Sequence, residues 1–372
     1  RLRRSSWQVG LSPVRHHGGA RTSLAILALS GILASAACSD DAASSSTGGT
    51  GGSDAIGGSS ATGGSPGSGG GAAGGGGAAA VTAEVVVAFD PTAGELPEGL
   101  SVSGGEALLG MATTSRVERL TLASGDRELL ATLPVPPPNA GFMTGVEKGP
   151  DGRIYAALVS FAPMPTAGVY LVEGGAASLF ASGSQMVFPN GLTWDASGTL
   201  YVSDSVAGTV FAVDQAGVVT PWLSDPHLLP DPDTCGAAAT GIQVGANGIA
   251  QASGAIYVAG NDQGVLLRVP ITAGAPGTPE VVAGPDCDLA GMDGIAVASD
   301  GAVFAVLNRS DRLVRIDPSG DVTILLEGPP LDFPASVAFG ASEQELYVTS
   351  FAVDGALSGG PAAPALLRVT LP

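Results

Sequence analysis

The sequence is poor in histidine, cysteine and positive charge. Its 372 residues hold three His, three Cys and 15 Lys+Arg, against 34 Asp+Glu. Beyond residue 80 the only histidine is His227, which argues against a histidine dyad and a dedicated His/Cys zinc site there. The same part holds ten Lys+Arg against 31 Asp+Glu, and so acidic a surface repels phosphate backbones. We therefore expect no nucleic-acid partner.

Long apolar runs are also scarce near the N-terminus. The run Leu24–Leu33 follows a basic segment and is too short to span a bilayer comfortably. Small residues and Cys38 come next, so residues 1–37 are expected to be an export signal, with a retained membrane anchor as the alternative. The segment before Cys38 is similar to the lipobox of bacterial lipoproteins, although Ser35 replaces the usual Leu. This resemblance implies acylation of Cys38, and therefore an exported protein that is lipid-anchored in the bacterial cell envelope or periplasm.

Two further parts follow the signal. Residues 38–80 are almost entirely Ser, Gly, Ala and Thr, a composition that has nothing to bury and is typical of a flexible tether. Residues 81–372 have the length and the apolar content of one large domain. The membrane is expected to be contacted only through the N-terminal lipid, and the domain is expected to be a monomer.

A short pattern recurs six times within residues 81–372. A small turn, usually with a Gly, opens an extended run, and a second strand with an aromatic residue follows. The residues at the openings are 46, 46, 57, 46 and 42 residues apart: Glu98, Thr144, Asn190, Asn247, Asp293 and Ala335. A strand-only repeat of this length predicts an all-β, six-bladed β-propeller with four-stranded blades.

The second strands and the two ends of the domain support this interpretation. Aromatic residues with matching spacing are expected to pack between blades: Tyr155, Tyr201, Tyr257, Phe304 and Tyr347. The last repeat supplies only three strands, and the unassigned run Glu84–Phe89 precedes the first repeat. We expect this N-terminal run to add the missing outer strand and close the ring, which protects a sheet edge.

The openings of the repeats carry the candidate chemistry. The inner strands of a propeller surround its axis, so equivalent positions face one another at one mouth of the channel. Four of the six positions carry side-chain oxygens, namely Glu98, Asn190, Asn247 and Asp293. Two carboxylates and amide oxygens are typical ligands of hard cations, so we expect Ca²⁺, with Mg²⁺ or Zn²⁺ as alternatives.

The same segments resemble the SMP-30/gluconolactonase family of six-bladed propellers over about residues 97–372. The matching motifs are Pro97-Glu98-Gly99, Pro189-Asn190-Gly191, Ala246-Asn247-Gly248 and Gly291-Met292-Asp293-Gly294. The resemblance implies that Glu98, Asn247 and Asp293 bind the metal, that Asn190 positions water or substrate, and that Asp293 also acts as the base. Members often have an Arg where this chain has Phe188, so the family's sugar-lactone substrate does not transfer directly.

Two functions follow from these observations. The first is a metal-dependent hydrolase that acts on a small lactone or a related ester. The second is a non-catalytic propeller, similar to NHL-type repeat proteins, that binds a partner through Met143, Phe188 and Trp222. It predicts no carboxylates pointing into the channel.

The two remaining cysteines lie in equivalent loops. Cys235 and Cys287 each stand shortly before a repeat opening, at Asn247 and Asp293. Equivalent loops of adjacent blades are neighbours, and an exported compartment permits disulfides. We expect a Cys235–Cys287 disulfide between blades four and five, with two free thiols as the alternative.

Overall fold

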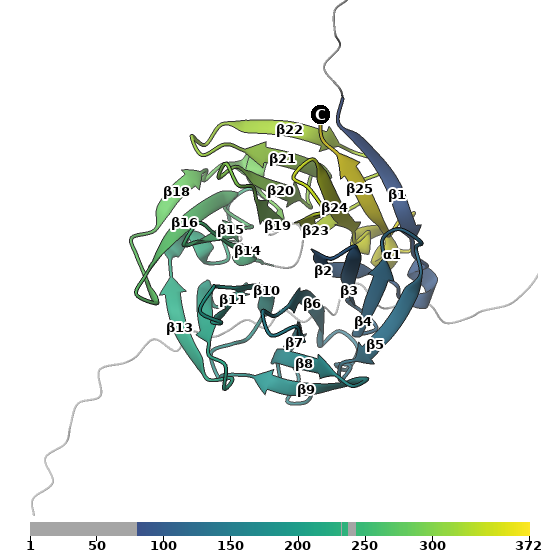
Figure 1. Cartoon of the computed structure of the whole chain (residues 1–372), viewed down its shortest axis with the longest axis horizontal. Helices are drawn as coiled ribbons and strands as arrows, with labels where there is room; N and C mark the ends of the chain where they lie inside the picture. The colour runs from purple at the N-terminus through teal and green to yellow at the C-terminus, as the bar shows by residue number, and fades with distance from the viewer. Residues whose placement is uncertain (1–79, 232, 237–242) are drawn as a thin grey trace, which may run out of the picture.

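The computed structural model describes residues 80–231, 233–236 and 243–372. Within them, six antiparallel sheets surround one central axis (Figure 1). Five sheets have four strands, and the sheet of blade four has a short additional one. The predicted six-bladed β-propeller is therefore confirmed.

The first three blades are formed by strands that follow one another in the sequence, from the axis to the rim. Blade one contains β2 (Pro97–Ser103), β3 (Glu106–Met111), β4 (Arg116–Thr121) and β5 (Arg127–Thr132). Blade two contains β6 (Gly141–Lys148), β7 (Ile154–Ser160), β8 (Gly168–Glu173) and β9 (Ala176–Ala181). Blade three contains β10 (Pro189–Trp194), β11 (Leu200–Asp204), β12 (Thr209–Val213) and β13 (Val219–Ser224).

The other three blades repeat this order. Blade four contains β14 (Ala246–Ala252), β15 (Ala255–Gly260), β16 (Val265–Thr272), β17 (Ala275–Pro276) and β18 (Glu280–Ala283). Blade five contains β19 (Met292–Val297), β20 (Val303–Leu307), β21 (Arg312–Ile316) and β22 (Val322–Glu327). Blade six contains β23 (Pro334–Phe339), β24 (Glu345–Ser350), β25 (Ala365–Thr370) and β1 (Thr82–Ala88).

The N-terminal strand closes the ring, as predicted. Strand β1 lies antiparallel to β25, with Thr82 opposite Thr370 and Ala88 opposite Ala365. It forms the outer edge of blade six, so both ends of the domain lie at the rim (Figure 1). This pairing gives β25 a hydrogen-bonded neighbour on each side.

The core lies between neighbouring blades. The five second-strand aromatic residues are all buried, as expected from the sequence. Tyr155 of blade two packs in one cluster with Leu192 and Leu200 of blade three, and Tyr347 of blade six packs with Leu100 of blade one. These rings therefore join each blade to the next, and the hydrophobic effect stabilises the whole ring.

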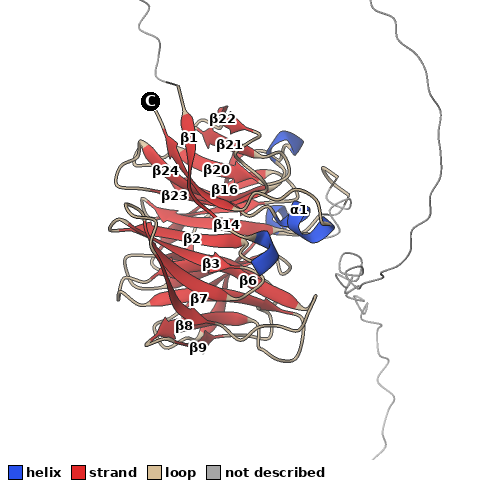
Figure 2. Cartoon of the chain, turned by 90° about the vertical axis from the view of Figure 1, so that its right-hand side faces the viewer, coloured by secondary structure: helices blue, strands red, loops and turns tan. Residues whose placement is uncertain are grey.

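The few helical segments lie on one face of the disc (Figure 2). Among the residues that the structure describes, they are η1 (Pro91–Ala93), η2 (Pro226–Leu228), η4 (Cys287–Leu289) and α1 (Val353–Ser358). Three of them precede an inner strand, and α1 joins β24 to β25. This face is therefore the one on which the inner strands begin.

The expected signal, tether and acylated Cys38 lie outside the described residues. They stay predictions. No helix in the described part of the chain is long and apolar enough to cross a membrane.

Candidate metal centre at the mouth of the channel

Each inner strand contains a β-bulge at the predicted site position. In blade three, Pro189 pairs with Asp204 and Leu192 pairs with Val202. The inner strand therefore has one more residue between these two pairs than its partner strand has. Each of the other five blades also has one extra residue at the equivalent place. A bulge bends the strand and re-aims a side chain, which explains why the opening residues leave the regular alternation of the sheet.

Glycine follows the site residue in five of the six bulges. A Cβ atom on Gly99 would lie 2.5 Å from the carbonyl oxygen of Thr144, and one on Gly145 would lie 2.5 Å from that of Asn190. Gly248 stands even closer to the carbonyl of Asp293. Only glycine permits this approach, so these residues bring neighbouring inner strands together at the axis. The sixth blade has Ser336 at this position.

Hydroxyl groups hold the backbone of the ring between blades. Thr349 Oγ1 of blade six donates to the carbonyl of Glu98 over 3.2 Å, and Ser203 of blade three donates to the carbonyl of Asn247. Thr144 Oγ1 donates over 2.9 Å to the carbonyl of Pro189, so its hydroxyl is engaged. Thr144 therefore has a structural role, in agreement with its omission from the predicted ligands.

The four predicted oxygen-bearing residues are all buried, with 4–8% of their surface exposed. Asn308 Nδ2 donates to Asp293 Oδ2 over 2.8 Å, which fixes that carboxylate. Asn190 Nδ2 donates to Ser205 Oγ over 3.0 Å, so the nitrogen of this amide, and not its oxygen, makes the contact with Ser205. Sequence reasoning gave no role to Ser205 or Asn308, although both occupy the first position after a second strand.

The two carboxylates influence each other across the channel. Burial and the charge of Asp293 raise the pKa of Glu98 well above its usual range. Burial raises the pKa of Asp293 to about 7, although hydrogen bonds from Asn308 and Asn247 act in the opposite direction. The structure thus brings together two acidic groups from blades one and five that water does not stabilise. A bound cation would balance their charge.

The donor set fits a hard divalent cation. Asn247 Oδ1 is buried and accepts no hydrogen bond, although a buried polar atom of this kind normally has a partner. The side chain of Asn247 also hydrogen-bonds to the Asp293 carboxylate. Among the residues that the structure describes, no three His, Cys, Asp or Glu side chains form a metal-binding group by themselves. Any cation here would therefore depend on amide oxygens, which suits Ca²⁺ or Mg²⁺ better than Zn²⁺.

The proposed binding surface of the non-catalytic alternative is wrong. Met143 and Phe188 are buried, with 0% and 4% exposed, and Trp222 is 9% exposed. Trp222 lies in the outer strand β13, where its ring packs 4.9 Å from that of Tyr201 and its Nε1 donates to Gly274. Outer-strand rings pack between blades, so an aromatic residue at this place does not indicate a binding face.

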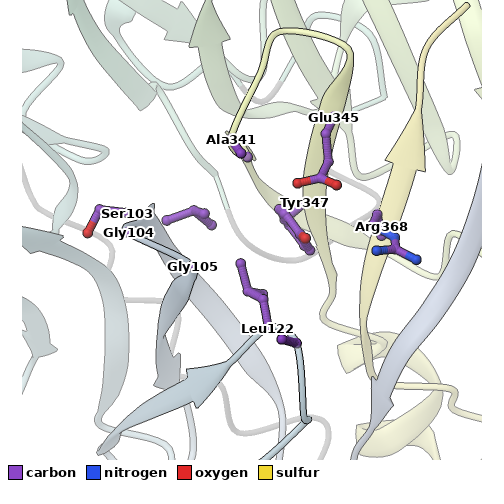
Figure 3. A pocket seen from close by; sticks show the side chains of 11 residues that line it. Ser103, Gly104, Gly105, Leu122, Ala341, Glu345, Tyr347 and Arg368 are labelled. Carbon is purple, nitrogen blue, oxygen red and sulfur yellow. The ribbon is translucent and has the colours of Figure 1, made fainter.

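A cavity of about 480 Å³ lies elsewhere, between blades one and six (Figure 3). It is lined by the turn at Gly104 and Gly105 and by Glu345, Tyr347 and Arg368. This turn follows the end of β2, whereas Glu98 lies near the start of the same strand. The cavity therefore belongs to the opposite end of the inner strand and is separate from the ring.

A disulfide joins Cys235 to Cys287 in the structure. Cys235 lies in the connection that enters blade four, and Cys287 begins η4, which precedes blade five. The covalent link therefore ties together the two loops in front of the strands that carry Asn247 and Asp293.

Known proteins share both the fold and part of the sequence pattern. Residues 229–352 match the family model described as the SMP-30/Gluconolactonase/LRE-like region, and this stretch includes Asn247 and Asp293. None of the curated proteins matches the chain.

Many solved structures are similar in fold. A luciferin-regenerating enzyme is 14% identical with a TM-score of 0.57, covering 78% of this chain and 95% of that chain. Regucalcin from Agrobacterium tumefaciens, described as a calcium-binding protein, is 21% identical with a TM-score of 0.55, covering 77% and 94%. A gluconolactonase from Xanthomonas campestris is 15% identical with a TM-score of 0.54, covering 75% and 86%. At these identities the structures establish the fold alone. The chain is thus a six-bladed β-propeller, and its residues 229–352 match the model of the SMP-30/Gluconolactonase/LRE-like region.

Proposed function

We propose that this protein is a divalent-metal-dependent hydrolase of a lactone or a related ester. One observation carries the proposal: the buried carboxylates of Glu98 and Asp293 influence each other electrostatically, and Asn247, whose side chain also contacts Asp293, has a buried oxygen without a hydrogen-bond partner. A propeller that only binds a partner has no need for two such carboxylates in its channel, and the non-catalytic alternative predicted none. The gluconolactonase and regucalcin among the similar structures support the same reading.

The residues of the ring have separate roles in this proposal. Glu98, Asn247 and Asp293 would hold the cation, and two carboxylates neutralise a divalent charge. When bound, the cation supplies Lewis acidity that polarises an acyl carbonyl and makes water a better nucleophile. Asn190, held through its amide nitrogen by Ser205, presents its oxygen to orient water or substrate. Asp293 accepts the proton that the attacking water loses, and Asn308 keeps its carboxylate in place.

Calcium is the proposed cation. Glu98, Asn247 and Asp293 offer hard oxygen ligands, and the similar regucalcin is a calcium-binding protein. The surface location follows from Cys38 and is part of the proposal too. A diacylated Cys38 at the start of the mature protein, measured by mass spectrometry of its N-terminal peptide, tests that location.

The test combines metal content with turnover. The purified full chain should bind about one Ca²⁺ by calorimetry and should hydrolyse members of a lactone panel. Asp293→Asn and Glu98→Gln should lose metal affinity and lower kcat/KM by at least ~10²-fold while remaining folded, as near-UV circular dichroism reports.

The matched control is Glu173→Gln, which removes an exposed carboxylate from the outer half of blade two. Its metal affinity and turnover should equal those of the wild type. Full activity in both ring variants, or in the metal-free wild type, would remove the proposal.

A further inference from the structure

The mouth of the channel is divided into an apolar half and a polar half. The division follows the residue two positions before each ring residue. In four blades this residue is large and apolar: Leu96, Phe142, Phe188 and Phe333. In blades four and five it is Gly245 and Gly291. In four blades the residue that follows the second strand shows the same division: it is Phe161 or Phe351 in blades two and six, and Asn261 or Asn308 in blades four and five. Blades one and three have the small residues Ala112 and Ser205 there.

The apolar residues form one continuous wall. The ring of Phe188 lies 5.6 Å from that of Phe142 and 6.1 Å from that of Phe161, edge to face in both pairs. Phe333 pairs in the same manner with Phe351 at 6.1 Å. Phe142 and Phe333 both pack against the cluster that contains Phe351, so the wall runs from blade three through blades two and one to blade six.

The wall reaches the ring itself. Ala335 stands at the ring position of blade six and belongs to the apolar cluster, together with Leu96, which precedes Glu98 by two residues. Phe161 is 41% exposed, and Phe142 and Phe333 are half-buried, so these three rings offer accessible surface. Phe188 and Phe351 are buried beneath them and support them.

The backbone of Phe333 is strained. Its φ is +46°, a left-handed conformation that bulky side chains rarely adopt. The carboxylate of Asp311 accepts its N–H over 2.7 Å and so helps to hold this conformation. Strain of this kind persists where the surrounding structure fixes it, and it concentrates at binding sites.

The opposite half presents polar groups. A Cβ on Gly291 would collide with Asn308 and Arg309, so the absence of a side chain there makes room for these two. Arg309 Nη2 donates to Asn261 Oδ1 over 3.0 Å and pairs with Asp262. Arg309 Nη1 is buried and donates to no residue that the structure describes. Hydrogen-bonding capacity therefore gathers on the side of blades four and five.

We infer that the substrate carries an apolar alkyl or aryl substituent on its lactone ring or ester group, and that this substituent lies on the phenylalanine wall. The inference rests on the proposed function, since it assumes that the acyl group reacts at the ring. The hydroxyl of Thr144, the ring residue of blade two, already donates to the carbonyl of Pro189. A polyhydroxylated lactone would leave its hydroxyl groups without partners against Phe142 and Phe333, which disfavours it.

The experiment compares two lactones of the same ring size on the Ca²⁺-loaded full chain. The alkyl substrate is δ-decalactone, and the polyhydroxylated one is glucono-1,5-lactone. We expect kcat/KM to favour δ-decalactone by about 10²-fold, which is the discrimination that a hydrophobic site achieves against added hydroxyl groups. Equal turnover, or preference for glucono-1,5-lactone, overturns the inference and leaves the proposed function standing.

Variants test whether the phenylalanine wall causes the preference for δ-decalactone. Phe161→Ser changes an exposed ring and so should preserve folding, and Phe142→Gln changes a half-buried one. Each should lower the ratio of the two kcat/KM values about tenfold. The matched control is Leu179→Ser, which removes a 45% exposed apolar side chain from the outer strand of the same blade and should leave the ratio unchanged. An unchanged ratio in both phenylalanine variants contradicts the inference.

A binding measurement keeps the two proposals separate. A δ-lactam that carries the same pentyl chain resists hydrolysis, and calorimetry compares it with the unsubstituted δ-lactam. We expect tighter binding of the pentyl lactam with a negative heat-capacity change, both reduced in Phe161→Ser. If no lactone is hydrolysed, the proposed function fails and this comparison still decides the inference: equal binding of the two lactams overturns it.

Discussion

Glu147 provides a test of how burial controls ionisation in this propeller. It lies on the inner strand β6, three residues beyond Thr144, and its Oε1 accepts a hydrogen bond of 3.0 Å from Ser101 of blade one. Burial raises the pKa of Glu147 to about 7, while the hydrogen bonds from Ser101 and the Lys148 backbone oppose the rise. None of the proposed catalytic roles uses this residue. We therefore use its charge as a test of stability.

The sign of the pH effect follows from proton binding. The folded-state pKa of Glu147 is raised, so between about pH 4.5 and about pH 7 the folded protein keeps a proton that the unfolded chain has released. Its contribution is favourable below this window and is lost as the pH rises through it. A pKa that rises from 4.5 to about 7 corresponds to about 3 kcal/mol of unfolding free energy.

Glu147→Gln removes the ionisation and keeps a hydrogen-bond acceptor for Ser101. We expect the variant to gain about 3 kcal/mol of unfolding free energy relative to the wild type when the pH is raised from about 4 to about 8. Urea unfolding followed by near-UV circular dichroism at several pH values measures this difference.

Glu173→Gln, on the same blade, is the control and should show no such trend, because its side chain is exposed. A stability difference between Glu147→Gln and the wild type that stays flat over this pH range would refute the reasoning. A Glu147→Gln variant that is less stable than the wild type at high pH would refute it too.

Two further predictions concern the way the ring is held together. Gly248→Ala should lower the unfolding free energy by about 1–3 kcal/mol and weaken Ca²⁺ binding, because the added methyl group displaces the backbone of Asp293; Gly183→Ala, whose Cβ would lie 3.6 Å from the nearest atom, should be tolerated in the same urea and calorimetry experiments. Reduction of the Cys235–Cys287 disulfide should lower stability by about 4 kcal/mol, from the loop entropy of a sequence separation of 52 residues. Unchanged denaturant midpoints with and without reductant would contradict the second prediction.

The blade architecture could be predicted because short sequence patterns mark each repeat. The spacing of Glu98, Asn190 and Asp293, together with that of the second-strand tyrosines, defines the blades without any long-range information. In blade three the sequence predicts strands over residues 190–194, 199–203, 208–214 and 218–223, and the observed strands begin and end within about one residue of these bounds. The pairing of β1 with β25 was predictable for a different reason. The last repeat had only three predicted strands, and the N-terminal strand belonged to no repeat.

The surroundings of the site were less accessible to sequence reasoning. Glu147 occupies a strand position that period-two alternation alone does not distinguish from a solvated one, and the closeness of blade one determines its burial. The division between Phe142 and Gly245 becomes visible only once the bulges align the inner strands. Trp222 failed as a marker of a binding face because an outer-strand ring is covered by the neighbouring blade.

The closure of the ring by β1 has a consequence for biosynthesis. Strand β1 is made before every blade, yet its partner β25 is the last strand to be made. Until then the valine-rich segment Val85–Val87 has an unpaired edge of the kind that promotes aggregation. Its pairing also closes the longest loop in the domain, a step that is entropically costly and slow. The completed chain is therefore the first species in which this segment is paired along one edge, and loss of the final few residues would leave it unpaired again.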